Sequence, residues 1–355
     1  MAFFDRFYTN VKINQVILID ALYLNSFGGK TILELIIQKV INSNMSFHFL
    51  IDKRLNSHYL KFLNSKDYTI IKASHSSRRF YYQKKKNTFS SILCLSNIPP
   101  PIKTPPIKTT IFFHNQLLLN SFKYETNIKS KIINQLKFFY INYYNNNDYN
   151  WITQTNLIKS MVHNHLKINL NKVSVFPIFE NRLELNKIEK TANSLVYVSS
   201  GVTHKNHIRL IKAFIKTAKN TDKEVKLHLT LNKEELPKYI YPQNLKVKFH
   251  GTLSIEDVNL LYNSCEFAIY PSLVESFGLP LIEAANHGCK VIASDLPYVH
   301  EIIKPSLTFD PYSIESMADA ILNAINEDDL PKTKVLVDNK LDNFIKFIIS
   351  QDVQK

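Results

Sequence analysis

The stretch FAIYPSLVESFGLPLIEAA, residues 267–285, carries the pattern that decides the fold. An apolar, β-rich run ends at Tyr270, a loop with Glu275 and Gly278 follows, and a helical pattern begins at Pro280. Glycine lets the backbone approach a ligand closely, and proline is favoured in the first turn of a helix. The stretch therefore predicts a strand, a ligand-facing loop and a helix, which together form the repeating unit of a parallel α/β sheet.

The same alternation of strand and helix patterns extends in both directions from this stretch. We expect strands at 15–21, 47–52, 68–73, 91–95, 109–114, 149–154, 172–176, 195–199, 225–231, 246–250, 267–270 and 290–293. We expect helices at 31–41, 127–145, 205–219, 255–263 and 280–286, and one more between the second and third strands. The pattern predicts an α/β protein with two Rossmann-like domains that face a ligand-binding cleft.

A length of 355 residues also favours two domains over one. Residues 181–192 are polar and show no strand period, so we place the domain boundary there. The first domain is then 1–180, the second 193–330, and a helical tail follows at 331–355, with packing back on the first domain as an option.

Neither a secretory signal nor a membrane-spanning segment is expected. The first residues contain no apolar core followed by a small-residue cleavage site, and no run of 18 uncharged apolar residues occurs. Cys94, Cys265 and Cys289 are odd in number and widely spaced, which favours buried thiols in a reducing compartment. We therefore expect a cytoplasmic protein.

The net charge of +14 first invites a nucleic-acid interpretation. The chain has 38 Lys and only 6 Arg, however, and reading of bases favours the bidentate arginine fork. Residues 1–180 hold 23 Lys+Arg and 8 Asp+Glu, a net charge of +15, so the excess lies entirely in the first domain. Basic residues are interspersed with aromatic residues in the segments 78–86 and 127–144. The second of these segments fits either an anionic membrane surface or a solvated helix face.

Glu275 and Glu283 are the carboxylates best placed for chemistry, because one lies on the loop and the other on the following helix. Carboxylates accept hydrogen bonds from hydroxyl groups, and the first turn of a helix attracts anions. A ligand with hydroxyl groups at both ends and a phosphate between them, such as a nucleotide sugar, would suit this pair. The alternative is a surface loop followed by a capped helix, in which the glutamate only interacts favourably with the positive end of the helix dipole.

The segment from Glu275 to Glu283, with its continuation AANHGCKVIASD at 284–295, resembles the E-x7-E signature of retaining GT-B glycosyltransferases of family 4. The resemblance covers most of the chain and is thin over the first 150 residues. It implies that Glu275 contacts hydroxyls of the donor sugar and that Glu283 binds the nucleotide ribose. It also implies that the backbone amides of Phe277, Gly278 and Leu279 hold the sugar and phosphate.

The stretch SSGVTHKN at 199–206 follows the first strand of the second domain. Lys205, near Gly201 and at the expected helix start, is placed to neutralise a diphosphate as a point charge; a solvated lysine is the alternative. The stretch resembles the phosphate-binding segment of the family, in which an arginine stands where this chain has Val202. Lys205 or Arg209 would compensate for that departure.

Two sites are expected in the first domain. Gly28-Gly29-Lys30-Thr31 suggests a P-loop, but Leu24 stands where that motif requires glycine. Gly28 and Gly29 instead resemble the family's N-terminal loop near the donor phosphate, with a plain strand–helix turn as the alternative. His114 is expected at the end of a strand. In the family, a histidine at this point often touches the donor sugar, and the resemblance implies that role for His114; a structural histidine is the alternative.

No metal site is expected. His163 and His165 diverge by about 200° on a helix and cannot share an ion, and no other histidines have ligand spacing. We expect no cofactor beyond the nucleotide-sugar donor.

The sequence thus predicts a retaining glycosyltransferase of the hexosyltransferase type. It would transfer a sugar from a nucleoside-diphosphate donor to a hydroxyl of a glycan acceptor, lipid-linked in our expectation, in synthesis of a bacterial surface polysaccharide such as O-antigen, capsule or lipopolysaccharide. It would bind no nucleic acid, and would work in the cytoplasm or peripherally at the inner face of the membrane. The alternatives are a GT-B nucleotide-sugar epimerase and a non-enzymatic basic nucleic-acid-binding protein. Base, sugar and acceptor are left open.

Overall fold

The computed structural model describes residues 16–24, 27–41, 43, 45–55, 58–85, 88–102, 107–119, 127–180 and 189–353. The chain forms two compact units. Unit 1 comprises 1–119, 132–180 and 338–355, and unit 2 comprises 120–131 and 181–337. Most of the expected boundary segment, 181–188, lies outside the described residues.

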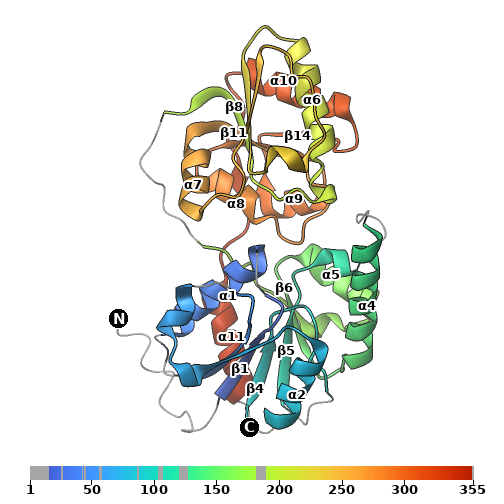
Figure 1. The fold of residues 1–355 in the computed structure, drawn as a ribbon, viewed down its shortest axis with the longest axis vertical. Helices are drawn as coiled ribbons and strands as arrows, with labels where there is room; N and C mark the ends of the chain where they lie inside the picture. The colour runs from blue at the N-terminus through green and yellow to red at the C-terminus, as the bar shows by residue number, and fades with distance from the viewer. Residues whose placement is uncertain are drawn as a thin grey trace. The chain divides into compact units, whose positions relative to one another are not determined.

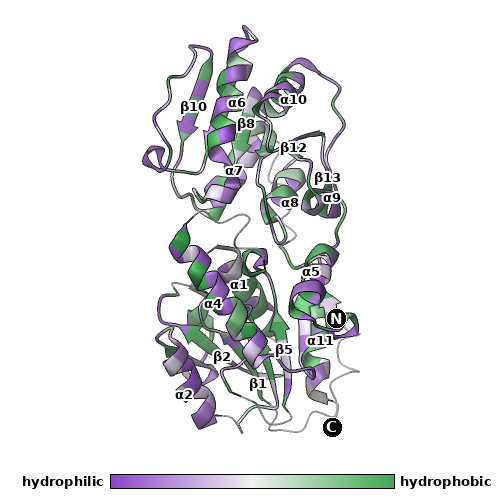
Figure 2. Cartoon of the chain, turned by 90° about the vertical axis from the view of Figure 1, so that its right-hand side faces the viewer, coloured by the Kyte–Doolittle hydropathy of each residue, from purple (hydrophilic) through white to green (hydrophobic). Residues whose placement is uncertain are grey.

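Unit 1 is built on a parallel seven-stranded sheet (Figure 1). Its strands are β1 (Val16–Ala21), β2 (Ser46–Asp52), β3 (Tyr68–Ile71), β4 (Ser91–Cys94), β5 (Lys108–Phe112), β6 (Asn150–Thr153) and β7 (Val173–Val175). They lie in the order β3-β2-β1-β4-β5-β6-β7, and every neighbouring pair is parallel. The inner strands are apolar because helices cover both faces of such a sheet, and Figure 2 shows hydrophobic residues along β1, β2 and β5.

Two hydrophobic clusters cover the two faces of this sheet. The helices of the unit are α1 (Phe27–Val40), α2 (His75–Lys85), α5 (Asn156–Leu166), α11 (Leu341–Val353) and α4 (Ile128–Tyr144), of which residues 128–131 are grouped with unit 2. Ile17 and Ile19 of β1 pack in a cluster with α1 and α11, whereas Leu18 packs in a cluster with α2, α4 and α5. The C-terminal helix α11 is therefore part of this unit, where Phe344 is fully buried.

Unit 2 contains a parallel six-stranded sheet of order β10-β9-β8-β11-β12-β14. Its strands are β8 (Thr191–Tyr197), β9 (Val225–Leu229), β10 (Leu245–Phe249), β11 (Cys265–Tyr270), β12 (Lys290–Ser294) and β14 (Leu307–Phe309), with an antiparallel pair of β13 (Ile303–Lys304) and β15 (Lys334–Val335) beside it. Its helices are α6 (His207–Lys219), α7 (Ile255–Ser264), α8 (Leu279–Asn286), α9 (Pro297–Ile302) and α10 (Ile314–Asn326).

The prediction of an α/β protein with two Rossmann-like sheets is confirmed, but three local expectations were wrong. The connection between β2 and β3 holds two short 3₁₀ helices, His58–Phe62 and Ser65–Asp67, where we expected an α-helix. Segments this short do not offset the cost of nucleating an α-helix. Helix α1 begins at Phe27 rather than 31, and α6 begins at His207 rather than 205. As a result, Gly28 and Gly29 lie within a helix rather than a loop, and Lys205 lies before α6 rather than on it.

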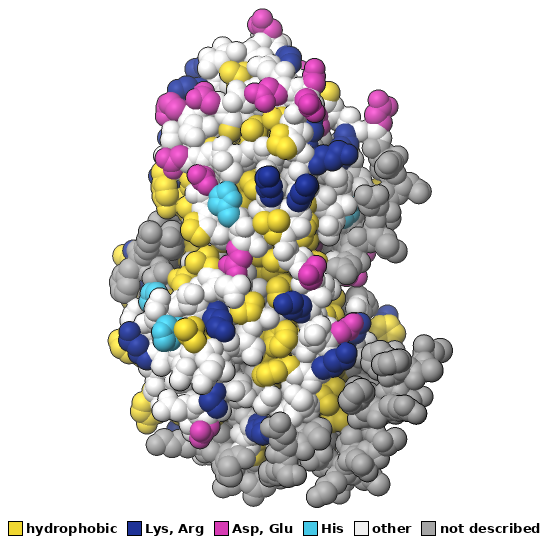
Figure 3. All heavy atoms as spheres, turned by 180° about the vertical axis from the view of Figure 1, so that it is seen from behind, with side chains coloured by type: hydrophobic (Ala, Val, Ile, Leu, Met, Phe, Trp, Pro, Cys, Tyr) yellow, Lys and Arg dark blue, Asp and Glu magenta, His cyan; other side chains and the backbone are white. Residues whose placement is uncertain are grey.

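The surface reflects the uneven charge of the sequence. On the face drawn in Figure 3, acidic and basic side chains are mixed over unit 2, in keeping with the 21 Lys+Arg and 22 Asp+Glu of residues 181–355. Within the described ranges, no helix is both long enough and apolar enough to cross a membrane.

Candidate functional site

The order of strands in unit 2 reverses between β8 and β11, which are adjacent and parallel. The chain proceeds from β8 outward to β9 and β10, and then returns to β11 on the other side of β8. The loops after two such strands leave the same edge of the sheet in opposite directions, and ligands of open α/β sheets bind at this point. The two loops here are 198–206 and 271–278, which contain Lys205 and Glu275.

Lys205 and Glu275 form an ion pair across these loops. The Lys205 Nζ atom lies 2.5 Å from Glu275 Oε1, and each side chain is only 14% exposed. The two residues are 70 positions apart in the chain. Partial burial strengthens such a pair, because little water screens the two charges.

A network of neutral hydrogen bonds fixes the backbone around the ion pair. The Leu273 amide donates to the His204 carbonyl at 2.8 Å, and the Tyr197 hydroxyl donates to the Lys205 carbonyl at 3.0 Å. The buried Asn206 side chain donates to the carbonyls of Pro271 and Pro311 at 3.1 and 2.8 Å. These bonds hold both loops in one arrangement before any ligand binds, which reduces the entropy lost on binding.

Three buried tyrosines interact electrostatically with the Glu275 carboxylate. Burial raises the pKa of Tyr197, Tyr270 and Tyr298, and the negative charge of Glu275 raises it further. Their hydroxyl groups therefore stay protonated. Lys205 Nζ also lies 5.8 Å from the centre of the Tyr270 ring, a cation–π distance.

The residues after Glu275 lie on the turn into α8. Phe277 is buried, and Gly278 has φ = +80°, a conformation that favours glycine. A β-carbon at Gly278 would lie 3.1 Å from the Leu281 side chain, so the position is also crowded. Leu279 opens α8, and Glu283 lies in its second turn.

Gly201 and Arg209 line a cavity of about 510 Å³ beside the loop 198–206. Arg209 donates to the Asn206 side chain at 3.0 Å, and Lys212 and Glu235 also line this cavity. Lys205 is not among its lining residues, and it lies in the 3₁₀ turn Thr203–Lys205 rather than on α6. Asn206, with φ = +65°, lies outside the helical conformation and separates the 3₁₀ turn from α6. The sequence pattern does not show this interruption, and it therefore placed the helix start too early.

In unit 1, His114 follows β5 and lies against Gly29. Its Nε2 atom is 3.0 Å from the Leu95 carbonyl oxygen and 3.2 Å from the Asn97 side-chain nitrogen, so the first contact is a hydrogen bond when Nε2 carries the proton and the second when Nε2 is an acceptor. Its backbone N–H donates to the Asn97 side chain at 2.6 Å. Burial lowers the pKa of His114 to about 4, so the imidazole is neutral at pH 7.

Gly28 and Gly29 lie in the first turn of α1, not in a loop as we expected. A β-carbon at Gly29 would lie 2.8 Å from the Leu24 side chain and 3.4 Å from the His114 ring, so this glycine permits the close packing of the two segments. Gly28 is exposed, with open space around its α-carbon. Residues 25 and 26 of the same expected loop lie outside the described residues.

The basic segment 78–86 is not a continuous surface patch, because Arg78 is fully buried. Its guanidinium binds the buried Asp20 carboxylate at 2.8 Å and the Pro99 carbonyl at 2.8 Å. The Tyr82 hydroxyl donates to the same carboxylate at 2.7 Å. Arg78 is thus a structural residue, and Lys86 lies outside the described residues.

In the described part of the chain, no group of three His, Cys, Asp or Glu side chains is arranged to hold a metal ion. The three cysteines are free and buried. Burial raises the pKa of Cys94 and of Cys289 to about 12, so both remain thiols at neutral pH.

Sequence reasoning missed three residues that organise these sites: Tyr197, Asn206 and Asn97. Asn97 and Asn206 both have positive φ, at 67° and 65°, which asparagine tolerates better than most residues. Asn206 is the last residue of the stretch 199–206, and Asn97 lies two residues after the expected strand 91–95; these positions were the available signal.

Comparison with known proteins gives a family match over the second half of the chain. Residues 179–340 match the family model of glycosyl transferases group 1. The chain is 27% identical over 179 residues to the O-antigen chain mannosyltransferase RfbU of Salmonella typhimurium, an alignment that covers 48% of this chain and 50% of that protein. The chain thus spans half or less of the length of the curated relatives that it matches.

Alignments with solved structures cover more of the chain than the sequence alignments do. The lipopolysaccharide outer core galactosyltransferase WaaB aligns with a TM-score of 0.56 at 16% identity, and the lipopolysaccharide glycosyltransferase WaaG with 0.62 at 13%. Each alignment covers 88% of this chain and 90% of the other. At these identities the likeness establishes the fold, which is GT-B.

Proposed function

We propose that this protein is a retaining family 4 glycosyltransferase that transfers a sugar from a nucleoside-diphosphate donor to an acceptor hydroxyl. The observation that carries the proposal is the contact between Lys205 and Glu275 at the point where the strand order of unit 2 reverses. A cation and a carboxylate side by side match the two ends of the reacting group, a diphosphate and a sugar with hydroxyls.

Donor binding would exchange partners within this pair. The diphosphate takes the Lys205 ammonium group, and the hydroxyls of the sugar donate to the Glu275 carboxylate that Lys205 releases. Each charged group thereby exchanges one partner for another and is never left unpaired. This avoids the free-energy cost of an unpaired charge in a partly buried site. The Phe277, Gly278 and Leu279 amides and Arg209 are proposed to hold the phosphates, and Glu283 the ribose.

In the transfer step, the acceptor oxygen forms a bond to the anomeric carbon on the face from which the diphosphate leaves. The bond from that carbon to the diphosphate oxygen breaks with its electron pair, and the acceptor proton passes to the leaving diphosphate. Lys205 stabilises the charge that develops on the leaving group, so no side chain has to act as a strong base. His114, neutral at pH 7, is proposed to form a hydrogen bond with the donor sugar.

The donor binds without a metal ion in this proposal. The acceptor is proposed to be a lipid-linked glycan of a bacterial surface polysaccharide, since the matched relative RfbU is an O-antigen mannosyltransferase. Such an acceptor lies at a membrane, and the net charge of +15 over residues 1–180 favours work at an anionic surface.

The proposal is tested by thermal-shift screening against UDP-, GDP- and dTDP-sugars, followed by a transfer assay with the best donor. A cognate donor raises Tm by mass action. We expect Lys205→Met to remove the shift caused by the nucleoside diphosphate alone. If no nucleotide or nucleotide sugar raises Tm, the proposal is wrong.

A further inference from the structure

Helix α4 of the described chain turns an apolar face toward solvent. Five of its side chains, each between 56% and 78% exposed, are Ile128, Ile132, Leu136, Phe139 and Tyr143. At roughly 100° per residue these five fall within an arc of about 80° on one side of the helix. We call them the α4 stripe. In Figure 2, α4 lies at the front of its unit, with hydrophobic residues along much of its length.

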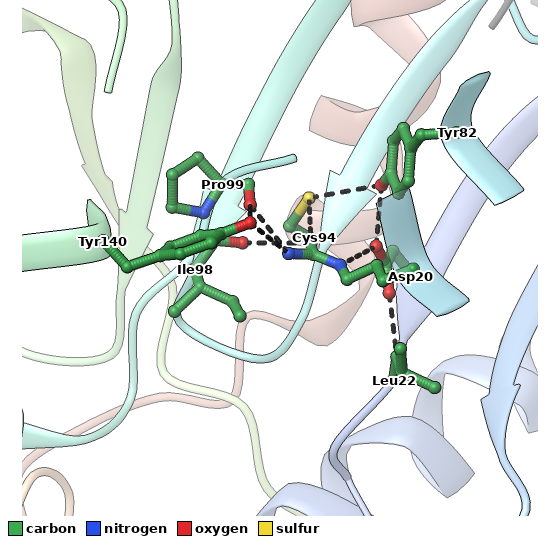
Figure 4. Close-up of polar contacts among 8 residues, drawn as sticks. Asp20, Leu22, Tyr82, Cys94, Ile98, Pro99 and Tyr140 are labelled. Carbon is green, nitrogen blue, oxygen red and sulfur yellow. Dashed lines mark hydrogen bonds and ion pairs between the residues drawn. The ribbon is translucent and has the colours of Figure 1, made fainter. Parts of the chain in front are cut away.

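The opposite side of α4 is the side that packs on the protein. Ile141 is fully buried in the cluster that α4 shares with α2 and α5, and Phe138 and Tyr140 pack against it. The Tyr140 hydroxyl lies 3.3 Å from Arg78 Nη1 and 3.4 Å from the Pro99 carbonyl oxygen (Figure 4). These contacts fix the rotation of the helix about its axis, so the α4 stripe cannot turn inward without breaking the buried Arg78 network.

A surface helix of a water-soluble protein normally carries polar residues on its outer face. Here the outer face is apolar over most of the helix, and contiguous exposed apolar surface of this kind marks an interaction site. The residues beside the stripe identify the partner. Helix α4 contains Lys129, Lys131 and Lys137 but no Asp or Glu. Lys129 and Lys131 flank the stripe on opposite sides.

An apolar stripe between lysines matches the boundary of an anionic bilayer, where apolar side chains enter the acyl region and cations remain at the lipid headgroups. Because α4 carries lysines and no carboxylate, the charge beside the stripe has one sign, which complements an anionic lipid surface. We propose that the α4 stripe, with Lys129 and Lys131, is the surface by which this protein binds an anionic membrane. The inference rests on the proposed function only in taking that membrane as the one that carries the acceptor.

The test is co-sedimentation of the whole protein with vesicles of phosphatidylcholine alone or with phosphatidylglycerol added. We expect binding to the anionic vesicles that falls as salt is raised. The combined replacement Ile132→Gln, Leu136→Gln and Phe139→Gln should weaken the vesicle partition coefficient at least roughly 100-fold, because the apolar area no longer enters the bilayer. Replacing Lys129 and Lys131 by glutamine should weaken it by roughly 30-fold.

Matched controls come from unit 2, which offers exposed residues of the same kinds. Ile240→Gln, Ile255→Gln and Leu260→Gln combined should leave vesicle binding unchanged, as should glutamine at the exposed Lys238, Lys246 and Lys248. Unchanged far-UV circular dichroism shows that each variant is folded. Equal loss in the control and stripe variants would overturn the proposal.

Two further outcomes would also overturn it. One is equal binding to neutral and anionic vesicles. The other is a wild-type dimer that the stripe variants convert to monomer in sedimentation velocity, with no vesicle binding by either, which would make the stripe a contact between copies. Donor-induced thermal shifts of the same variants separate this proposal from the proposed function. Wild-type protein that binds donor but no vesicle contradicts only the membrane surface, and protein that binds vesicles but no donor contradicts only the glycosyltransferase.

Discussion

Replacing Glu275 with glutamine separates the two roles proposed for the Lys205–Glu275 pair. Glutamine keeps the shape of the side chain and removes its charge, so Lys205 loses its counter-ion at 2.5 Å. A hydrogen bond to a charged group contributes about 1.5–3 kcal/mol, and loss of one such bond to the donor sugar lowers kcat/KM by about 10- to 150-fold. The affinity for the nucleoside diphosphate alone should rise instead, by up to about tenfold, because the diphosphate no longer competes with Glu275 for Lys205.

The assay measures both quantities on one preparation: kcat/KM for transfer from the cognate donor, and Kd of the nucleoside diphosphate by calorimetry. Glu315→Gln is the matched control, because Glu315 pairs with Lys216 at 2.8 Å in the same unit but both side chains are well exposed. Neither measurement should change in that variant. Transfer by Glu275→Gln at the wild-type rate would refute the reasoning, and so would a diphosphate Kd that weakens as much as transfer does.

The other predictions concern stability. Removal of the buried cation in Arg78→Met leaves Asp20 uncompensated and should cost about 3–5 kcal/mol in urea unfolding, and a smaller loss in the double variant with Asp20→Asn would confirm the pairing. Gly278→Ala places a side chain at φ = +80° and should lower the free energy of unfolding by about 1–2 kcal/mol, whereas Gly28→Ala, in open space within a helix, should not lower it. His114 has its pKa lowered by burial to about 4, so the unfolded chain binds the extra proton between pH 6.5 and 4 and stability falls as pH drops through that window. His114→Gln should reduce this fall between pH 6.5 and 5, as measured by urea unfolding at each pH, and an unchanged slope would contradict the cause.

The regular elements of both sheets were predictable because strands buried on both faces have continuous apolar sequences. Strand β11 and helix α8 were expected at 267–270 and 280–286 and occur at Cys265–Tyr270 and Leu279–Asn286. Local signals also identified Glu275 and Lys205 as candidates before any coordinates were known. The connection between β2 and β3 was less predictable, because a short polar segment carries no periodicity that separates one helix type from another.

The positions that depend on unusual backbone conformations were not predictable. Asn97 and Asn206 adopt positive φ because their side chains are held by partners distant in the chain, His114 in one case and Pro271 and Pro311 in the other. A local pattern contains no information about such partners. The start of α6 was misplaced for this reason.

The sequence by itself determined the α/β alternation, the uneven charge of the two halves and the residue types of the candidate site, since each depends on neighbours within a few positions. Only the tertiary structure decided which of them meet. It brought Lys205 to Glu275 across 70 residues, buried Arg78 out of a basic segment, and chose the face of α4 that meets solvent. Helix α4 carries apolar residues on both faces, so its periodicity could not say which face was inward. That choice was made by packing around Ile141 and by the hydrogen bonds of Arg78 to a carboxylate and carbonyls far away in the chain.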